Sequence, residues 1–284
     1  MPELPEVENV RLTVSRHVLG RRVLAVHVRR ADIVEGSRHP LALLQGCVIH
    51  AMTRHGKQLA IEGLKADSTP GPGLCVHLGM TGSLRCHPAT LAQDDPLLTD
   101  KHVHLLWQLD QGGWMTFRDP RRFGGLWTYD TYPQLVASRW TTLGPDALLI
   151  TPSQLHASLN RTRRPIKAAL LDQAIVAGLG NIYVDETLFA CAIHPLTPCH
   201  TLSPEAVTGL VKAFKAILKR AINSGGSTIR NYANGEGQAG GFQKTLKVYG
   251  RSGQNCFTCS TPLTSQAVIG RTTTFCPQCQ LLTA

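Results

Sequence analysis

The sequence predicts an α+β protein of several domains, with an N-terminal helix, an antiparallel β-sandwich, a helical region and a C-terminal four-cysteine module. The first apolar residues recur at helical spacing, short alternating segments follow up to about residue 127, and helical patterns resume after Gly144-Pro145. Two cysteine pairs lie near the end of the chain. For a length of 284 residues we place the domains at 1–145, 146–247 and 248–284.

The first helix is predicted from Pro5 to Leu19. Its apolar stripe is formed by four valines at helical spacing, Val7, Val10, Val14 and Val18. Gly20 follows at the point where a helix of this length would stop. The chain is therefore expected to enter a helix almost at once.

Short strands are predicted to follow this helix. Alternating patterns cover Arg22–Val34, Gly46–Leu64 and Leu74–Cys86, and a hairpin joins His102–Leu109 to Trp114–Asp119 through the turn Asp110-Gln111-Gly112-Gly113. The segments Asp67–Gly73 and Thr90–Asp100 are interpreted as exposed loops. Several short strands with turn signals between them favour an antiparallel sandwich or barrel.

Three helices are predicted in the second half, at Ile166–Ala177, Ile182–Ala190 and from Ser203-Pro204 onward. Ser203 is a suitable N-cap with Pro204 at the first helical position, and Gly225-Gly226 would end the long helix. The glycine-rich stretch Asn231–Gly241 has little to bury, so we expect a mobile loop there.

The cysteines fall into two groups. Cys256-x2-Cys259 and Cys276-x2-Cys279 are separated by 16 residues, which fits a four-thiolate zinc site. A pair of disulfides or an iron site is the alternative. Because four thiolates close the coordination sphere, one zinc ion would have a structural role. Five scattered cysteines, Cys47, Cys75, Cys86, Cys191 and Cys199, are interpreted as small buried hydrophobes or inert thiols.

The net charge of +10 is concentrated in the second half of the chain. Residues 1–150 contain 16 basic and 14 acidic residues, whereas residues 151–284 contain 13 basic and 5 acidic residues. This excess suits binding to a polyanion, although a solvated basic face would look the same. With no apolar run near the ~20 residues of a membrane span and no signal-peptide pattern, we expect a soluble protein without a membrane partner.

The N-terminus contains a candidate nucleophile. Pro2 becomes the terminal residue once Met1 is removed, and an α-amino group titrates near ~7.7–8, far below the ~10.4 of lysine. Such an amine can attack an electrophilic carbon, and Glu3 and Glu6, one helical turn apart, could exchange protons beside it. The simpler interpretation is a frayed terminus with acids that favour a helix start.

Motifs along the whole chain resemble bacterial formamidopyrimidine-DNA glycosylases. They are MPELPEVE at the start, His55–Lys57 (HGK), His77–Leu84 (HLGMTGSL), Asp119–Gly124 (DPRRFG), Leu170–Gln173 (LLDQ), Ala177–Glu186 (AGLGNIYVDE), Val248–Arg251 (VYGR) and the cysteine module. Leu4 and the complete DPRRFG resemble the purine-lesion branch more than the oxidised-pyrimidine relative, endonuclease VIII.

The resemblance implies a helix-two-turn-helix domain, a β-hairpin zinc finger and a bifunctional DNA glycosylase/AP lyase of base excision repair. It would remove 8-oxoguanine and formamidopyrimidines through a Pro2 Schiff base, followed by β,δ-elimination. Glu3 resembles the proton-transferring acid and Glu6 a supporting carboxylate. Lys57 and Arg271 resemble residues that contact phosphates at the catalytic site, although either could be a plain surface charge.

The resemblance also implies residues that bind damaged double-stranded DNA. His77, Asn181 and Arg251 would join Arg271 at the DNA, although Asn181 could equally be an ordinary N-cap. Met80 and Arg121 would replace the extruded base while Phe123 wedges beside the opposite one; the alternative is a core Met and Phe and a surface Arg. Ser227 would belong to a loop that covers the flipped base.

The expected protein is a monomer in the bacterial cytoplasm, associated with the nucleoid. Three alternatives remain: an endonuclease VIII-like glycosylase for oxidised pyrimidines, a catalytically inactive zinc-ribbon DNA binder, and a basic zinc-bearing structural protein. Trapping with borohydride separates an enzyme from a binder, and lesion preference separates the two enzymes.

Overall fold

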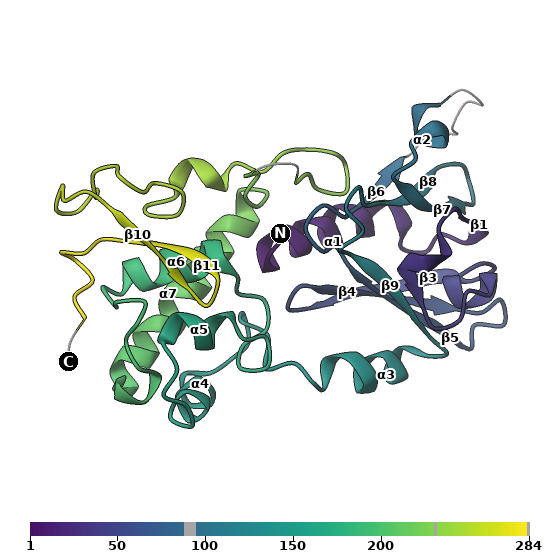
Figure 1. Ribbon diagram of the computed structural model, residues 1–284. Helices are drawn as coiled ribbons and strands as arrows, with labels where there is room; N and C mark the ends of the chain where they lie inside the picture. Colours follow the sequence, from purple (N-terminus) through teal and green to yellow (C-terminus); the bar gives the residue numbers. More distant parts are fainter. Residues whose placement is uncertain (88–94, 230–231, 283–284) are drawn as a thin grey trace. The chain divides into compact units, whose positions relative to one another are not determined.

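The computed structural model describes residues 1–87, 95–229 and 232–282 (Figure 1). The chain forms two compact units. Unit 1 comprises Met1–Thr142 and Ser224–Gly241, and unit 2 comprises Leu143–Asn223 and Phe242–Ala284. The segment Ser224–Gly241 thus groups with unit 1 although it follows the predicted helical region. The three domain boundaries expected from the sequence stay predictions.

Unit 1 is built on two β-sheets. The strands are β1 (Val23–Val28), β2 (Val34–Glu35), β3 (Val48–His55), β4 (Gln58–Leu64), β5 (Pro70–His77), β6 (Ser83–His87), β7 (Val103–Leu109), β8 (Trp114–Arg118) and β9 (Gly125–Tyr129). One sheet has the order β1-β7-β8-β6 and the other β2-β9-β5-β4-β3. All neighbours pair antiparallel except β2 and β9, which pair in parallel. The predicted sandwich is confirmed.

The first helix, α1 (Leu4–Val18), packs against both sheets of unit 1 (Figure 1). Its four stripe valines are fully buried and share one core with apolar side chains of the two sheets. The chain leaves the helix at Leu19, and Gly20 adopts a positive φ of 77°. Helical periodicity therefore located this element to within one residue at each end.

The expected exposed loop at 67–73 is wrong in its second half. Strand β5 begins at Pro70, and Gly71 to Gly73 are buried within it. A Cβ on Gly71 would lie 2.8 Å from the Gly63 carbonyl oxygen, and one on Gly73 would lie 3.0 Å from the Tyr132 Cα. The glycines allow close packing of backbones rather than a turn.

The expected loop at 90–100 is described only from residue 95 onward. There the structure has a short helix, α2 (Pro96–Thr99), whose N-cap Asp95 accepts a hydrogen bond from the Leu97 amide at 2.8 Å.

A further short helix, α3 (Tyr132–Leu135), covers the outer face of the five-stranded sheet and packs near β4, β5 and β9. It packs there with a small apolar cluster around Ala60, Cys75 and Leu135.

Unit 2 is helical with one hairpin. Its elements are α4 (Pro152–Leu159), α5 (Ile166–Leu171), α6 (Asn181–Ala190), α7 (Pro204–Asn223), β10 (Thr264–Val268) and β11 (Arg271–Phe275). Ser203 caps α7, and its Oγ accepts a hydrogen bond from the Ala206 amide at 3.2 Å. Within the described residues, no helix has both the length and the apolar character needed to cross a membrane.

Helix α5 is shorter than the predicted 166–177. It ends at Leu171 because the Asp172 carboxylate accepts a hydrogen bond from the Ala174 amide at 3.0 Å, which turns the chain. Gln173 stabilises the following bend by donating to the Leu179 carbonyl at 3.0 Å and accepting from the Gly178 amide at 2.9 Å. Side-chain hydrogen bonds to the backbone thus end a helix that apolar periodicity would extend.

The described part of the glycine-rich stretch, residues 232–241, is packed rather than free. Gly235 donates to Thr13 Oγ1 at 2.8 Å and accepts from the Cys86 amide at 2.9 Å, which attaches the stretch to α1 and β6. Ala233 and Asn234 are buried. The expectation that this stretch has little to bury is therefore wrong for these residues, while residue 231 lies outside the described chain.

Candidate active site and nucleic-acid interface

The start of α1 places two carboxylates out of solvent. Glu3 is 3% exposed and Glu6 is 2% exposed, and Pro2 beside them is also buried. The Glu3 amide donates to Glu6 Oε2 at 2.8 Å. Such burial of acids is unusual without bonding partners, so this terminus is not the frayed end that the simpler interpretation assumed.

Glu6 joins α1 to the segment that follows α7. Its Oε1 accepts a hydrogen bond from the Ser227 amide at 2.7 Å, and its carbonyl accepts one from the Tyr232 hydroxyl at 3.1 Å. Gly226 adopts a φ of +84°, and a Cβ there would lie 3.1 Å from Glu6 Oε1. Glu6 therefore holds Ser227, the predicted lesion-loop residue, against the helix that carries Pro2 and Glu3.

Lys57 lies in the two-residue turn between β3 and β4. His55 pairs with Gln58 across the turn, and Gly56 adopts a φ of +56°. Lys57 is only 8% exposed, which differs from an ordinary surface lysine. This burial contradicts the alternative of a plain surface charge.

His77 ends β5, opposite Gln58 of the same turn. Burial lowers the pKa of His77, the positive charges of Lys57 and Arg139 lower it further, and the charge of Asp119 opposes them. The imidazole is therefore neutral near pH 7 and carries one N–H donor. Lys57 therefore lies close enough to His77 for its charge to lower the pKa of the imidazole.

Met80, Arg121 and Phe123 lie on two turns of unit 1 and are accessible to solvent. Met80 is 39% exposed and Phe123 is 54% exposed, so neither fills the core. The Arg121 guanidinium carbon lies 4.5 Å from the centroid of the Phe123 ring, which orients both side chains together. An exposed aromatic ring beside a cation suits contact with nucleobases.

Asp119 holds these two turns together, a role that sequence reasoning did not assign. The carboxylate is fully buried and accepts hydrogen bonds from Thr81 Oγ1 and from the Gly124 amide at 2.7 Å. A Cβ on Gly79 would lie 2.3 Å from the Phe123 carbonyl carbon, so the turns touch backbone to backbone. Its place as the first residue of the DPRRFG motif was the signal in the sequence that could have pointed to this role.

In unit 2, Asn181 lies on α6 and Arg271 on β11, and a hydrogen bond to the Thr272 carbonyl oxygen links these two elements. Asn181 opens α6, and its Nδ2 donates to the Thr272 carbonyl oxygen at 2.8 Å. The N-cap of α6 is Gly180, so the capping role considered for Asn181 is wrong. Arg271 precedes Thr272 on β11 and is exposed.

A buried ion pair lies at this junction. Lys167 Nζ lies 2.6 Å from Asp185 Oδ1 and donates to the Thr272 carbonyl oxygen at 3.3 Å, and both charged side chains are inaccessible to solvent. Asp185 Oδ2 accepts from the Thr274 amide at 3.1 Å. Sequence reasoning missed both residues, although they lie in or near quoted motifs.

Arg251 is held by its own turn. Its guanidinium donates to the Lys247 carbonyl, to Gln254 Oε1 at 3.0 Å and to the Asn255 carbonyl at 3.0 Å. Glu186 accepts hydrogen bonds from the amides of residues 247, 248 and 249. The VYGR segment is thus fixed to α6, which orders the start of the cysteine module.

The four cysteines Cys256, Cys259, Cys276 and Cys279 present their sulfur atoms within 4.8 Å of one another. The Sγ–Sγ distances are 3.9 Å for Cys256–Cys279 and 3.4 Å for Cys259–Cys276. Zn–S bonds of about 2.3 Å in a tetrahedron separate sulfurs by about 3.8 Å. Among the described residues, the buried cluster here is small and includes Cys256 and Cys276 themselves, so the group fits a metal that supplies folding energy.

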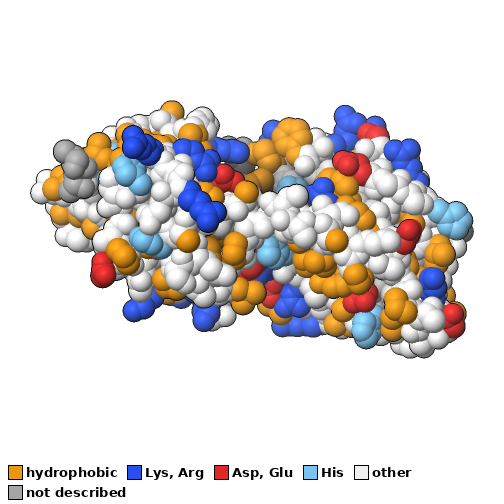
Figure 2. All heavy atoms as spheres, turned by 90° about the horizontal axis from the view of Figure 1, so that it is seen from below, with side chains coloured by type: hydrophobic (Ala, Val, Ile, Leu, Met, Phe, Trp, Pro, Cys, Tyr) orange, Lys and Arg blue, Asp and Glu red, His pale blue; other side chains and the backbone are white. Residues whose placement is uncertain are grey.

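Figure 2 shows one face of the molecule, on which Lys and Arg side chains recur across the surface with acidic side chains between them. The candidate residues divide between the units. Unit 1 holds Pro2, Glu3, Glu6, Lys57, His77, Met80, Arg121, Phe123 and Ser227, and unit 2 holds Asn181, Arg251, Arg271 and the four cysteines. A polyanion is the partner class that such basic residues suit.

Comparison with protein families matches two models to this chain. The formamidopyrimidine-DNA glycosylase N-terminal domain matches residues 1–126, and the H2TH domain of the same glycosylases matches residues 143–233. Curated proteins named formamidopyrimidine-DNA glycosylase are similar over nearly the full length. The Bacillus licheniformis protein is 39% identical, with 99% of each chain covered, and the Listeria innocua protein is 35% identical, with 99% of this chain and 100% of the other covered.

Solved structures agree with this match. A variant of the Lactococcus lactis protein bound to DNA containing Fapy-dG has a TM-score of 0.88, 33% identity and coverage of 99% of this chain and 100% of that chain. MutM bound to DNA containing carbocyclic 8-oxo-G has a TM-score of 0.86 and 32% identity, with 99% and 100% covered. The two family models and the relatives at 35% to 39% identity over nearly the full length show that the chain belongs to the formamidopyrimidine-DNA glycosylase family.

Proposed function

We propose that this chain removes oxidised purines, 8-oxoguanine and formamidopyrimidines, from double-stranded DNA and then cleaves the abasic strand. Family membership supports a DNA glycosylase, and similar proteins have been solved with DNA containing Fapy-dG, an 8-oxoguanine analogue or an abasic site. The observation that carries the proposal is the buried Pro2-Glu3 start of α1, with Glu6 bonded to the Glu3 amide.

Pro2 is the proposed nucleophile once Met1 is removed. A secondary amine that titrates near ~7.7–8 is partly unprotonated at neutral pH. Its nitrogen attacks C1′ of the damaged nucleotide, the glycosidic bond breaks, and the base leaves with a proton. Glu3 protonates the ring oxygen O4′ as the glycosidic bond breaks, so that the sugar opens and the nitrogen and C1′ are left joined as an iminium cation.

The iminium then acts as an electron sink. Loss of a proton from C2′ expels the 3′ phosphate by β-elimination, and loss of a further proton from the conjugated product expels the 5′ phosphate by δ-elimination. Hydrolysis of the iminium releases the sugar fragment and restores the Pro2 amine. The steps are a substitution, proton transfers, two eliminations and a hydrolysis, so no oxidant or reductant takes part.

The remaining candidate residues are proposed to hold the DNA. Lys57, His77, Asn181 and Arg271 would bind phosphates near the lesion, with Arg251 at the start of the cysteine module. Extruding a nucleotide costs a few kcal/mol, and Met80, Arg121 and Phe123 would fill the space that it leaves. Their exposure supports this role because exposed side chains can enter a DNA duplex.

The cysteine module is proposed to hold one Zn²⁺ ion through Cys256, Cys259, Cys276 and Cys279. A four-thiolate ion has no open position for substrate, so its contribution is folding energy for the hairpin that carries Arg271.

The test is a strand-cleavage assay on duplexes that contain 8-oxoguanine, a formamidopyrimidine or an oxidised pyrimidine. Wild-type protein should prefer the two purine lesions, and Glu3→Gln should lose base excision while it still binds the duplex. Glu35→Gln, an exposed glutamate of the same unit, is the control and should remain active. Preference for the pyrimidine would favour the endonuclease VIII-like alternative, and binding without cleavage would contradict enzymatic function.

A further inference from the structure

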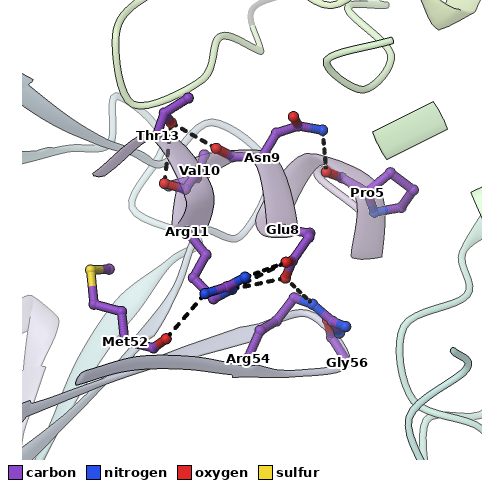
Figure 3. Close-up of polar contacts among 9 residues, drawn as sticks. All are labelled: Pro5, Glu8, Asn9, Val10, Arg11, Thr13, Met52, Arg54 and Gly56. Carbon is purple, nitrogen blue, oxygen red and sulfur yellow. Dashed lines mark hydrogen bonds and ion pairs between the residues drawn. The ribbon is translucent and has the colours of Figure 1, made fainter. Parts of the chain in front are cut away.

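Glu8, one turn beyond the proposed catalytic residues of α1, binds two arginines (Figure 3). Glu8 Oε1 accepts from Arg11 Nη2 at 2.6 Å, and Glu8 Oε2 accepts from Arg54 Nε at 2.9 Å. Burial alone would raise the pKa of Glu8, but the hydrogen bonds and charges of Arg11 and Arg54 outweigh it and keep the pKa below its usual value. The carboxylate is therefore ionised and anchors both guanidinium groups.

Arg54 extends this anchor to the turn that carries Lys57. Its Nη1 donates to the Gly56 carbonyl oxygen at 2.9 Å, and its side chain is 7% exposed. The Gly56 carbonyl and the Lys57 amide belong to one planar peptide unit, so a bond to the oxygen sets the orientation of the whole plane. Gly56 has a wide conformational range without such a restraint.

From this geometry we infer that Arg54 is a positioning residue for Lys57. Glu8 fixes Arg54 to α1, and Arg54 fixes the Gly56–Lys57 peptide plane. The Lys57 ammonium is thereby held at a fixed position relative to α1, the helix that follows Pro2 and Glu3. The inference rests on the proposed phosphate-binding role of Lys57. It assigns to Glu8 and Arg54 a task in the reaction through their contacts within the protein.

Arg11 provides a matched control within the same cluster. It shares the Glu8 carboxylate with Arg54, but its Nη1 donates to the Met52 carbonyl oxygen at 3.4 Å and not to the Lys57 turn (Figure 3). Removing either arginine takes one ion pair from Glu8. Only the removal of Arg54 also removes a hydrogen bond to the Gly56–Lys57 peptide.

The experiment compares Arg54→Met with Arg11→Met in single-turnover cleavage of an 8-oxoguanine duplex, each in the wild-type and the Lys57→Ala background. Because an error of about 1 Å in a positioned group can cost about 100-fold in rate, Arg54→Met should slow cleavage by about 10-fold to 100-fold. Arg11→Met should change the rate by less than about twofold. In the Lys57→Ala background, Arg54→Met should have no further effect, since its target is already absent.

A second variant, Glu8→Gln, keeps both arginines and covers the case in which Arg54→Met does not fold. It should slow cleavage in the same direction by a smaller factor, and only when Lys57 is present. Rate losses that multiply with Lys57→Ala, or equal losses for the Arg11 and Arg54 variants, would overturn the inference. A Lys57→Ala protein with wild-type activity would overturn it too but leave the glycosylase intact, whereas an inactive wild-type protein would refute the proposed function itself.

Discussion

The chemistry proposed for this chain depends on buried carboxylates that are hydrogen-bonded to specific neighbouring residues. The Glu6 carboxylate accepts hydrogen bonds from the amides of Glu3 and Ser227. The Asp119 carboxylate accepts hydrogen bonds from Thr81 Oγ1 and from the Gly124 amide. Sequence motifs supplied the residues that are proposed to contact DNA, because those residue types are chemically distinctive, and these contacts stay predictions. The bonding roles of Asp119, Arg54 and Glu186 were not predicted, although Asp119 and Glu186 lie in quoted motifs, because the distant groups that they bond to leave no signal in the sequence.

Phe123 tests whether an exposed aromatic side chain serves DNA or packing. With 54% of its surface exposed, Phe123→Ala should change the free energy of unfolding by less than about 0.5 kcal/mol, whereas a core Phe→Ala costs about 3–5 kcal/mol. It should slow lesion cleavage in duplex DNA and affect a single-stranded abasic site much less. Thermal unfolding and two-substrate kinetics measure this, and a large loss of stability with equal kinetic losses would assign Phe123 to the core.

His77 leads to a prediction about pH. Burial first, and then the charges of Lys57 and Arg139, lower its pKa below the usual 6.5, so the folded state binds fewer protons than the unfolded state. This contribution to stability is fully present above pH 6.5 and is lost as the pH falls through the folded-state pKa. His77→Gln should therefore lose less stability on acidification than wild type in urea titrations. Parallel curves for the two proteins would contradict this assignment.

At the scale of elements, periodicity and caps located most helices and strands. The α1 stripe, the Ser203 cap and the β7–β8 hairpin lie where the pattern predicts. The errors have physical causes: glycines at 71–73 pack in a strand, and Asp172 ends a helix by bonding to the backbone. Local patterns cannot show which backbone a distant glycine will touch.

Gly79 is predicted to be required for the contact between the two turns that carry Met80 and Phe123. Gly79→Ala combines a φ of +58° with a Cβ 2.3 Å from the Phe123 carbonyl carbon. Gly46→Ala is the control, because its φ is +82° and its Cβ would meet nothing within 4 Å. The control should lose about 1–2 kcal/mol from backbone strain alone. Gly79→Ala should lose about 1–3 kcal/mol more in urea unfolding, and equal losses would argue against a required contact.

The cysteine module should depend on its metal for folding. Cys276→Ser should release zinc, unfold only the residues after about Val248 and weaken DNA binding, because a closed site supplies local folding energy. Cys199→Ser, another fully buried cysteine of unit 2, should retain the metal. Metal analysis and circular dichroism measure both effects. Fully active wild-type protein that contains no zinc would contradict the role of the module.

At the scale of the whole molecule, motifs from both halves of the sequence predicted the family, and family models over residues 1–126 and 143–233 confirm it. The fold class followed from the same motifs and from patterning. Contacts between segments that are far apart in the sequence could not be predicted from these motifs and patterns. The residues after α7 return to α1 through Glu6 and Thr13, and only tertiary structure reveals that return.

The central claim is that the Pro2 amine forms the covalent link to the damaged nucleotide. Intact mass spectrometry after borohydride reduction on an 8-oxoguanine duplex tests it most directly, because one spectrum reports the terminus, the covalent bond and the substrate. We predict a reduced adduct on Pro2 in protein without Met1, and no adduct when an N-terminal extension retains Met1 although DNA binding persists. A borohydride adduct on the extended protein, or full strand cleavage by the extended protein of verified mass, would contradict the account.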